Sequence, residues 1–217
     1  MDASRVYTFE SVRETSKAFA TALQNKYGLQ KGDVISVFSE NDVDVGPLTY
    51  GALYAGCIVS PANPAYSVEE FAYMLKDAGV KALITQASML STAQKAATLA
   101  GIPDDKIIIL GAKRGPQGGP KHFREVLKPN VSNHRVKVDP VKDLAFLVYS
   151  SGTTGLPKGV MLNHKNIVAD ILMVNHSVGS AYHWKTDRLL GVLPFFHIYG
   201  KSTGFPPASF LRANRDA

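Results

Sequence analysis

The stretch that decides the fold lies at residues 144–159 and reads LAFLVYSSGTTGLPKG. Its first five residues are apolar and predict a buried strand. The loop that follows, residues 149–159, contains two serines, two threonines, three glycines and one lysine. Hydroxyl donors, close backbone approach and one positive charge therefore meet in one place, which is the chemistry of a polyphosphate site.

Two other interpretations of this loop are weaker. The P-loop of NTPases needs glycine before its lysine and a hydroxyl residue after it, whereas Pro157 precedes Lys158 and Gly159 follows it. A flexible Gly/Ser linker is disfavoured, because linkers seldom follow a buried strand or hold a lysine between proline and glycine.

Helix and strand patterns alternate through most of the chain. Apolar residues at helical spacing predict helices near residues 12–23, 47–56, 68–78 and 88–100, and a last helix with Ile167, Ile171, Val174 and Val178 on one face. Short apolar runs predict strands at residues 34–38, 57–60, 82–85, 106–110, 144–148 and 188–193. This alternation predicts an α/β fold, with a doubly wound, mainly parallel sheet flanked by helices. Residues 111–141 contain GPQGGP and no clear period, so we expect a surface connector there.

Composition indicates a globular protein. The 217 residues are 45% hydrophobic and 19% charged, with a single cysteine, Cys57, whose apolar neighbours predict a core position rather than a catalytic thiol. No apolar run approaches the ~20 residues that span a bilayer, and the start MDASRVYTFE lacks the apolar core of a signal peptide. We therefore expect no membrane span and an intracellular location, with cytoplasm and peroxisome both open.

The net charge of +6 is concentrated in one segment. Residues 112–142 hold eight lysines or arginines against Glu125 and Asp139. A nucleic-acid footprint is disfavoured because Phe123 is the only aromatic residue in this segment and no RNA- or DNA-binding motif accompanies it. A solvated connector that weakly attracts anionic ligands is the better interpretation.

Three stretches together resemble one family. Residues 149–167, YSSGTTGLPKGVMLNHKNI, resemble the signature of the adenylate-forming (AMP-binding) superfamily, most closely the 4-coumarate:CoA ligase and fungal acyl-CoA ligase branch. Residues 193–200, LPFFHIYG, resemble the next block of that family, and residues 51–85 resemble its early helix, strand and proline-rich turn. The resemblance covers about residues 5–200. It predicts a partial AMP-binding N-terminal domain over residues 1–200 and a divergent tail over residues 201–217.

The resemblance implies a reaction with two halves. A carboxylate attacks the α-phosphorus of Mg-ATP to give an acyl-adenylate and pyrophosphate, and the thiol of coenzyme A then displaces AMP to give a thioester. ATP, Mg²⁺ and coenzyme A are thus the implied cofactors, and a small carboxylic acid is the implied partner. The residues implied to hold the β- and γ-phosphates are Ser150, Ser151, Gly152, Thr153, Thr154 and Lys158, while Gly155 and Gly159 are implied to let the loop fold over the nucleotide.

His197 and Tyr199 are the candidates beside the reacting carboxylate. A lone histidine among aromatic residues is more often part of a core, but by resemblance His197 lies next to the carboxylate and α-phosphate, where it can donate to developing charge. Tyr199 resembles the acyl-pocket tyrosine of the family and favours an aromatic acid. Phe195 and Phe196 are as readily core residues. The other histidines lack metal-ligand spacing, so no metal site is predicted for them; they are His122, His134, His164, His176 and His183.

The chain also departs from the family pattern. The later adenine, ribose and hinge-lysine blocks are absent, and residues 201–217, KSTGFPPASFLRANRDA, depart from the expected apolar helix. A truncated form is therefore expected, which would make no acyl-CoA and would leave apolar surface near its last strands uncovered. Three functions stay open: an acyl-CoA ligase, an inactive chain that binds nucleotide phosphates, and an unrelated phosphate-binding interaction module.

Overall fold

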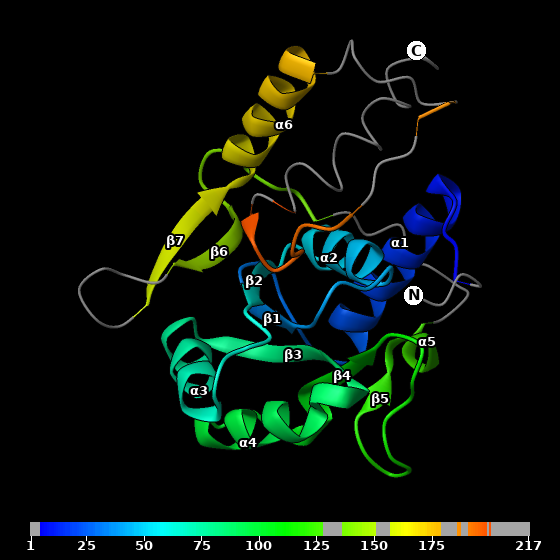
Figure 1. The fold of residues 1–217 in the computed structure, drawn as a ribbon, viewed down its shortest axis with the longest axis vertical. Helices are drawn as coiled ribbons and strands as arrows, with labels where there is room; N and C mark the ends of the chain where they lie inside the picture. The colour runs from blue at the N-terminus through cyan, green and yellow to red at the C-terminus, as the bar shows by residue number, and fades with distance from the viewer. Residues whose placement is uncertain are drawn as a thin grey trace.

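The computed structural model describes residues 5–127, 136–150, 157–178, 186–187, 191–198 and 200, which form a seven-stranded sheet with helices on both faces (Figure 1). The strands are β1 (Val34–Phe38), β2 (Ile58–Ala62), β3 (Val80–Gln86), β4 (Ile107–Leu110), β5 (Lys121–His122), β6 (Leu144–Ser150) and β7 (Lys158–Asn163). The helices are α1 (Phe9–Asn25), α2 (Val45–Tyr54), α3 (Val68–Asp77), α4 (Leu90–Ala100), α5 (Phe123–Val126) and α6 (His164–Val178), with short 3₁₀ turns η1 (Ala87–Met89) and η2 (Asp104–Lys106).

The sheet has the order β5-β4-β3-β1-β2-β6-β7. Every neighbouring pair is parallel except β6 and β7, which are antiparallel. The predicted doubly wound, mainly parallel α/β fold is therefore confirmed. Because the strands from β5 to β6 share one direction, their carboxyl ends lie along one edge of the sheet.

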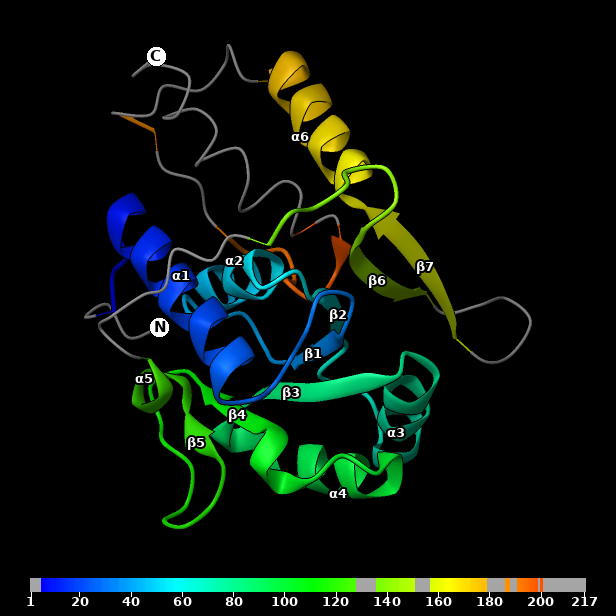
Figure 2. The ribbon, with the colours of Figure 1, turned by 180° about the vertical axis from the view of Figure 1, so that it is seen from behind.

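The core has two layers, one on each face of the sheet. Helices α1 and α2 pack on one face, where Phe19, Leu23 and Leu48 are fully buried against β1 and β2. Helices α3 and α4 pack on the other face, where Phe71 and Ala93 are buried against β3 and β4. Figure 2 shows both layers from behind. The strands in the middle of the sheet are covered on both sides, which explains their continuous apolar sequences.

Local signals set several helix ends as predicted. Ser67 is the N-cap of α3: its side chain accepts a hydrogen bond from the Glu70 amide at 3.2 Å, and Glu70 Oε2 accepts one from the Ser67 amide at 2.8 Å. Asn163 holds the start of α6 in a similar way, since its side-chain oxygen accepts from the Asn166 amide at 2.8 Å. These reciprocal bonds satisfy amides that the first turn of a helix leaves unpaired.

Three predictions about elements are wrong. The glycine loop does not lead directly to α6, because β7 intervenes and pairs with β6 through all six of its residues. The segment 111–141 is not only a connector: it contains β5 and α5, whose Phe123 and Val126 are buried in the core. Residues 191–193 are not a strand, and residues 188–190 lie outside the described residues. The two missed strands, β5 and β7, are short, and each is a strand only through its pairing with a neighbour in the sheet.

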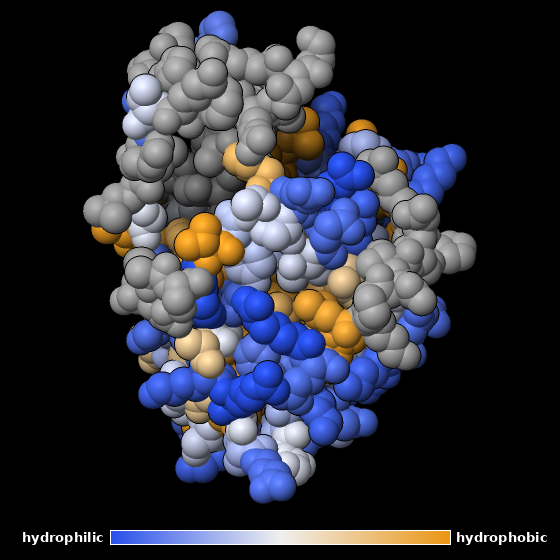
Figure 3. Space-filling view, turned by 90° about the vertical axis from the view of Figure 1, so that its right-hand side faces the viewer, coloured by the Kyte–Doolittle hydropathy of each residue, from blue (hydrophilic) through white to orange (hydrophobic). Residues whose placement is uncertain are grey.

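The single cysteine is a core residue, as predicted. Cys57 is fully buried just before β2, and this burial raises the pKa of its thiol to about 12. Among the described helices, none is long and apolar enough to cross a membrane. In the view of Figure 3, hydrophilic side chains cover most of the lower part of the surface, and hydrophobic ones form separate patches.

Exposed apolar side chains gather on β7 and α6. On these two elements, the large apolar side chains exposed by 47% or more are Val160, Met161, Val168, Leu172 and Met173. The uncovered apolar surface is instead expected from the sequence at residues 144–148 and 188–193. Ala145 and Phe146 of β6 are buried, while Val192 and Leu193, in the described part of the second stretch, are exposed.

Candidate functional site

A cavity of about 640 Å³ opens at the carboxyl ends of β2 and β6. Its walls come from the ends of these strands, from β7, from α6 and from the segment 196–198. The residues that line it are Pro61, Asn63, Tyr66, Val148, Tyr149, Ser150, Val160, Leu162, Asn166, Ile167, Asp170, Phe196, His197 and Ile198. Ligands of α/β proteins bind outside the carboxyl ends of the strands, so this cavity lies where the fold places a site.

The β6–β7 hairpin joins the two ends of the phosphate-loop sequence. Tyr149 pairs with Gly159, and Ser150 pairs with Lys158. Ser150 lines the cavity and is exposed, and Lys158, also exposed, starts the neighbouring strand. The hydroxyl of Ser150 and the side chain of Lys158 therefore lie at the two ends of the loop. The predicted phosphate ligands Ser151, Gly152, Thr153 and Thr154, and also Gly155, lie outside the described residues.

Gly159 was expected to let the loop fold over the nucleotide, but the structure gives it a different role. It is a residue of β7, with no left-handed backbone angle. A Cβ at this position would lie 3.1 Å from Cδ1 of Leu147 and 3.3 Å from Cζ of Tyr149. Gly159 thus lets the aromatic ring of Tyr149 pass close to the partner strand, and close packing rather than loop freedom accounts for it.

Tyr149 ties the end of β6 to α3. Its hydroxyl donates a hydrogen bond to the Asp77 carboxylate at the end of α3. Burial raises the pKa of Tyr149, and the Asp77 hydrogen bond and charge raise it further. The phenol therefore stays a neutral donor. Ser60 adds a second tie, because its hydroxyl donates to the Leu147 carbonyl oxygen at 2.9 Å. Together these contacts fix the strand that leads into the predicted phosphate loop.

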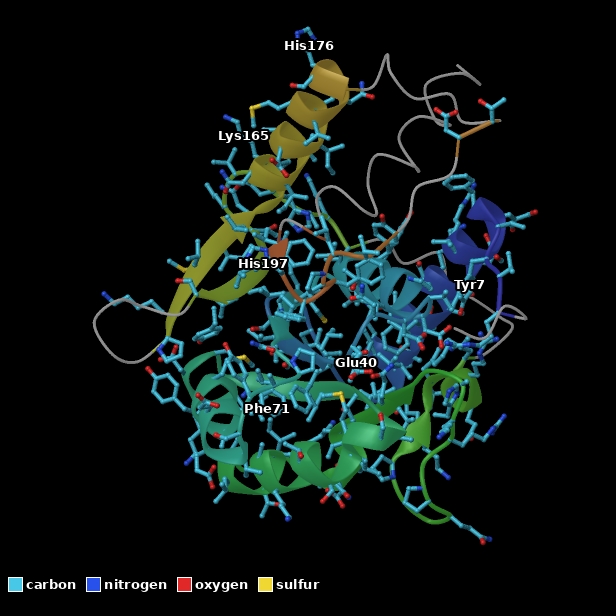
Figure 4. The ribbon with its side chains drawn as sticks, in the orientation of Figure 1. Tyr7, Glu40, Phe71, Lys165, His176 and His197 are labelled. Atoms are coloured by element: carbon cyan, nitrogen blue, oxygen red, sulfur yellow. The ribbon has the colours of Figure 1, made fainter. Side chains whose placement is uncertain are left out.

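His197 also lines the cavity. It ends a turn in which its amide donates to the Pro194 carbonyl oxygen at 3.1 Å, and its side chain is exposed at the cavity. In the view of Figure 4, His197 lies beside β6. Phe195 packs against the core formed by α1 and α2, whereas Phe196 lines the cavity. Tyr199 lies outside the described residues.

Four polar residues of the cavity were missed in the sequence. Asn63 and Tyr66 follow β2, and Asn166 and Asp170 lie on α6. The spacing of four between Asn166 and Asp170 puts both on one face of the helix, and this is the only local signal that pointed to them. Burial raises the pKa of Tyr66, with a smaller contribution from the charge of Glu70.

The other described histidines have structural surroundings or lie on the surface. His122 is buried and its Nε2 lies 2.8 Å from the Gly111 carbonyl oxygen. Burial lowers the pKa of His164, and His176 is exposed near the end of α6. His134 and His183 lie outside the described residues. Within the described part of the chain, no group of three His, Cys, Asp or Glu residues suits a metal ion.

The model of the AMP-binding enzyme family matches residues 1–211, which is nearly the whole chain. The chain belongs to the AMP-binding enzyme family. It is 31% identical over 216 residues to a long-chain-fatty-acid–CoA ligase of Escherichia coli O6:H1, covering 89% of this chain and 38% of that protein. It is 38% identical over 199 residues to 4-coumarate–CoA ligase 2 of Solanum tuberosum, covering 90% of this chain and 35% of that protein.

The fold is also similar to solved structures of AMP-binding enzymes. A long-chain-fatty-acid-CoA ligase from Archaeoglobus fulgidus superposes with a TM-score of 0.78 at 24% identity, over 94% of this chain and 38% of that chain. At this identity the likeness concerns the fold alone. The chain spans 35–38% of the length of the two curated relatives named above.

Proposed function

We propose that this AMP-binding chain takes part in the ATP-dependent activation of a carboxylic acid, as an acid–thiol ligase. In the first half-reaction a carboxylate oxygen bonds to the α-phosphorus of ATP, and the bond to the bridging oxygen breaks, releasing pyrophosphate. In the second half-reaction the thiol of coenzyme A attacks the acyl carbon, loses its proton, and releases AMP. One observation carries the proposal: Ser150 and His197 line the same cavity, and Lys158 pairs with Ser150 across the β6–β7 hairpin.

The proposed roles follow from charge. Pyrophosphate leaves with several negative charges, and a lysine at the loop mouth stabilises them without needing a proton transfer. Hydroxyls and amides of the loop, including Ser150, would donate to the phosphate oxygens. Mg²⁺ would enter bound to the phosphates of ATP and offset their charge further. His197 would donate a hydrogen bond to the carboxylate or α-phosphate as negative charge moves between them.

The cavity also suggests where the organic part of the acid lies. Val148, Leu162, Ile167 and Phe196 give it an apolar wall, while Asp170 and Asn166 give it a polar one. An apolar wall suits aryl and fatty acids, the substrate classes in the names of the two relatives. ATP and coenzyme A are intracellular metabolites, so an intracellular location forms part of the proposal.

A second candidate function is nucleotide-phosphate binding without catalysis. It would need only the Ser150 hydroxyl and the charge of Lys158, which the β6–β7 hairpin pairs, and no group that acts on the acid. Exchange of labelled pyrophosphate into ATP, measured with a panel of aryl and fatty carboxylates, separates the two functions. Acid-dependent exchange supports the ligase. Binding of Mg-ATP without exchange supports the second function, and absence of both would contradict each of them.

Lys158→Ala is expected to weaken Mg-ATP binding by about tenfold to a hundredfold, because a charged hydrogen bond is worth roughly 1.5–3 kcal/mol. Titration calorimetry of the purified chain measures this change. Lys165→Ala is the matched control, since it removes the same charge from an exposed position at the start of α6 (Figure 4). We expect that control to change the dissociation constant by less than about twofold. If both substitutions weaken Mg-ATP binding equally, Lys158 is not part of the ATP site.

A further inference from the structure

The side chain of Asn41 joins the end of β1 to the segment that carries His197. Its Nδ2 donates to the Leu193 carbonyl oxygen at 2.8 Å and to the Gly191 carbonyl oxygen at 3.3 Å. Its Oδ1 accepts from the Phe195 amide at 2.7 Å. These three hydrogen bonds join residues that lie about 150 positions apart in the sequence. We infer that Asn41 is a positioning residue, which holds residues 191–195 so that His197 faces the cavity.

Asn41 can act as an anchor because its own backbone is held. It follows β1, the strand at the middle of the sheet, and lies at the edge where the carboxyl ends meet. The neighbouring Glu40 amide donates to Oε1 of Gln86, at the end of β3, at 3.2 Å. On the other side, the Asp44 amide donates to Oδ1 of Asp42 at 2.9 Å, which closes the turn into α2. Asn41 therefore lies between backbone groups that hydrogen bonds hold on both sides, next to the central strand.

The contacts require an amide side chain. Asn41 uses both a donor and an acceptor, so aspartate could accept from Phe195 but could not donate to the two carbonyl oxygens. Leucine, of similar size, could do neither. The half-buried position makes the loss of these bonds costly, because the carbonyl and amide groups would be left without this partner.

The anchor ends two residues before His197. Phe195 and Phe196 lie within the turn that the His197 amide closes by donating to the Pro194 carbonyl oxygen at 3.1 Å. Phe195 itself packs against the α1–α2 core. In Figures 1 and 2 the orange segment with these residues runs beside α2. A shift of this segment therefore moves the imidazole within the cavity.

The inference rests on the proposed function, in which His197 touches the reacting groups. Displacing a catalytic group by about 1 Å can reduce a rate about a hundredfold. Loss of the anchor should therefore lower the rate of acid-dependent pyrophosphate exchange while leaving Mg-ATP binding nearly unchanged, because Lys158 and Ser150 lie on the β6–β7 hairpin. Substitution of a residue that only stabilises the fold would lower both the exchange rate and the affinity for Mg-ATP.

The test uses Asn41→Ala and Asn41→Asp, each alone and combined with His197→Ala. We expect Asn41→Ala to lower kcat for exchange by about tenfold to a hundredfold and to change the dissociation constant of Mg-ATP less than about twofold. In a chain that already carries His197→Ala, adding Asn41→Ala should lower kcat no further, because both substitutions act through the same imidazole. Loss of the same size with and without His197 would overturn the inference.

Amide hydrogen exchange gives a readout that does not depend on catalysis. The Phe195 amide should exchange faster in Asn41→Ala and stay protected in Asn41→Asp, which keeps the acceptor. Gln94→Ala is the control, because it removes an amide side chain that donates to Asp104 Oδ2 at 2.8 Å on α4, away from the cavity. If no carboxylate supports exchange of pyrophosphate, the proposed function fails, while protection of Phe195 still decides whether Asn41 holds the segment. Unchanged protection in Asn41→Ala would overturn it.

Discussion

Asp44→Ala is expected to lower the free energy of unfolding by about 3–5 kcal/mol, the range for breaking a buried ion pair from one side. Asp44 is fully buried at the start of α2. It accepts hydrogen bonds from Arg5 Nη1 at 2.7 Å, the Tyr7 hydroxyl at 2.7 Å, the Gly111 amide at 3.1 Å and Arg124 Nη2 at 3.4 Å. Removing the carboxylate leaves these donors without their shared acceptor.

Urea unfolding followed by circular dichroism measures this loss. Glu14→Ala is the control, because Glu14 is 56% exposed and pairs with Lys17 at 3.3 Å and with Arg13 at 3.9 Å. An exposed pair of this kind contributes about 0–1 kcal/mol. If the two substitutions cost the same, the buried cluster of Asp44, Arg5, Tyr7 and Arg124 does not stabilise the fold as argued.

Phe71→Ala is expected to cost about 3–5 kcal/mol as well, through lost burial and the cavity left behind. Phe71 is fully buried in α3, and its ring stacks on that of Phe38 in β1, with centroids 4.2 Å apart and planes at 24°. This pair joins the α3–α4 layer to the middle of the sheet. The substitution therefore removes apolar contacts that no neighbour can replace without moving a strand or a helix.

Thermal and urea unfolding of Phe71→Ala should be compared with Phe9→Ala. The two substitutions remove the same atoms, but Phe9 stands at the start of α1 and is 42% exposed. Its loss should cost about 1–2 kcal/mol, in proportion to the area that it buries. A Phe71 variant as stable as the Phe9 variant would show that the α3–α4 layer repacks freely.

Local signals in the sequence were enough for most helices and for the central strands. The capping pair of Ser67 and Glu70 lies within four residues, so its geometry follows from the sequence itself. The strand β7 was missed for the opposite reason. Its residues are mostly exposed, and only pairing with β6 makes them a strand. No propensity of KGVMLN indicates that partner.

The residues of the candidate site also fall into two groups, those with a local sequence signal and those without one. Ser150 and His197 were found because each belongs to a recognisable motif, and both line the cavity. Asn63, Tyr66 and Asp170 reach the cavity through the packing of β2 and α6, which no local pattern encodes. Asn41 was missed because its partners lie about 150 residues away. A side chain with several distant hydrogen bonds looks, in the sequence, like any turn residue.

The link between Asn41 and Leu193 also bears on the order in which the protein folds. It closes a loop of 152 residues, for which the entropic cost scales as 1.5 RT ln n and amounts to about 4 kcal/mol. Strands β1, β2 and β3 pair within residues 34–86, over much shorter loops. The sheet centre can therefore form first, and the segment with His197 docks late. A ligand that binds only the docked form would shift the docking equilibrium toward that form, so that ligand binding and completion of the cavity are coupled.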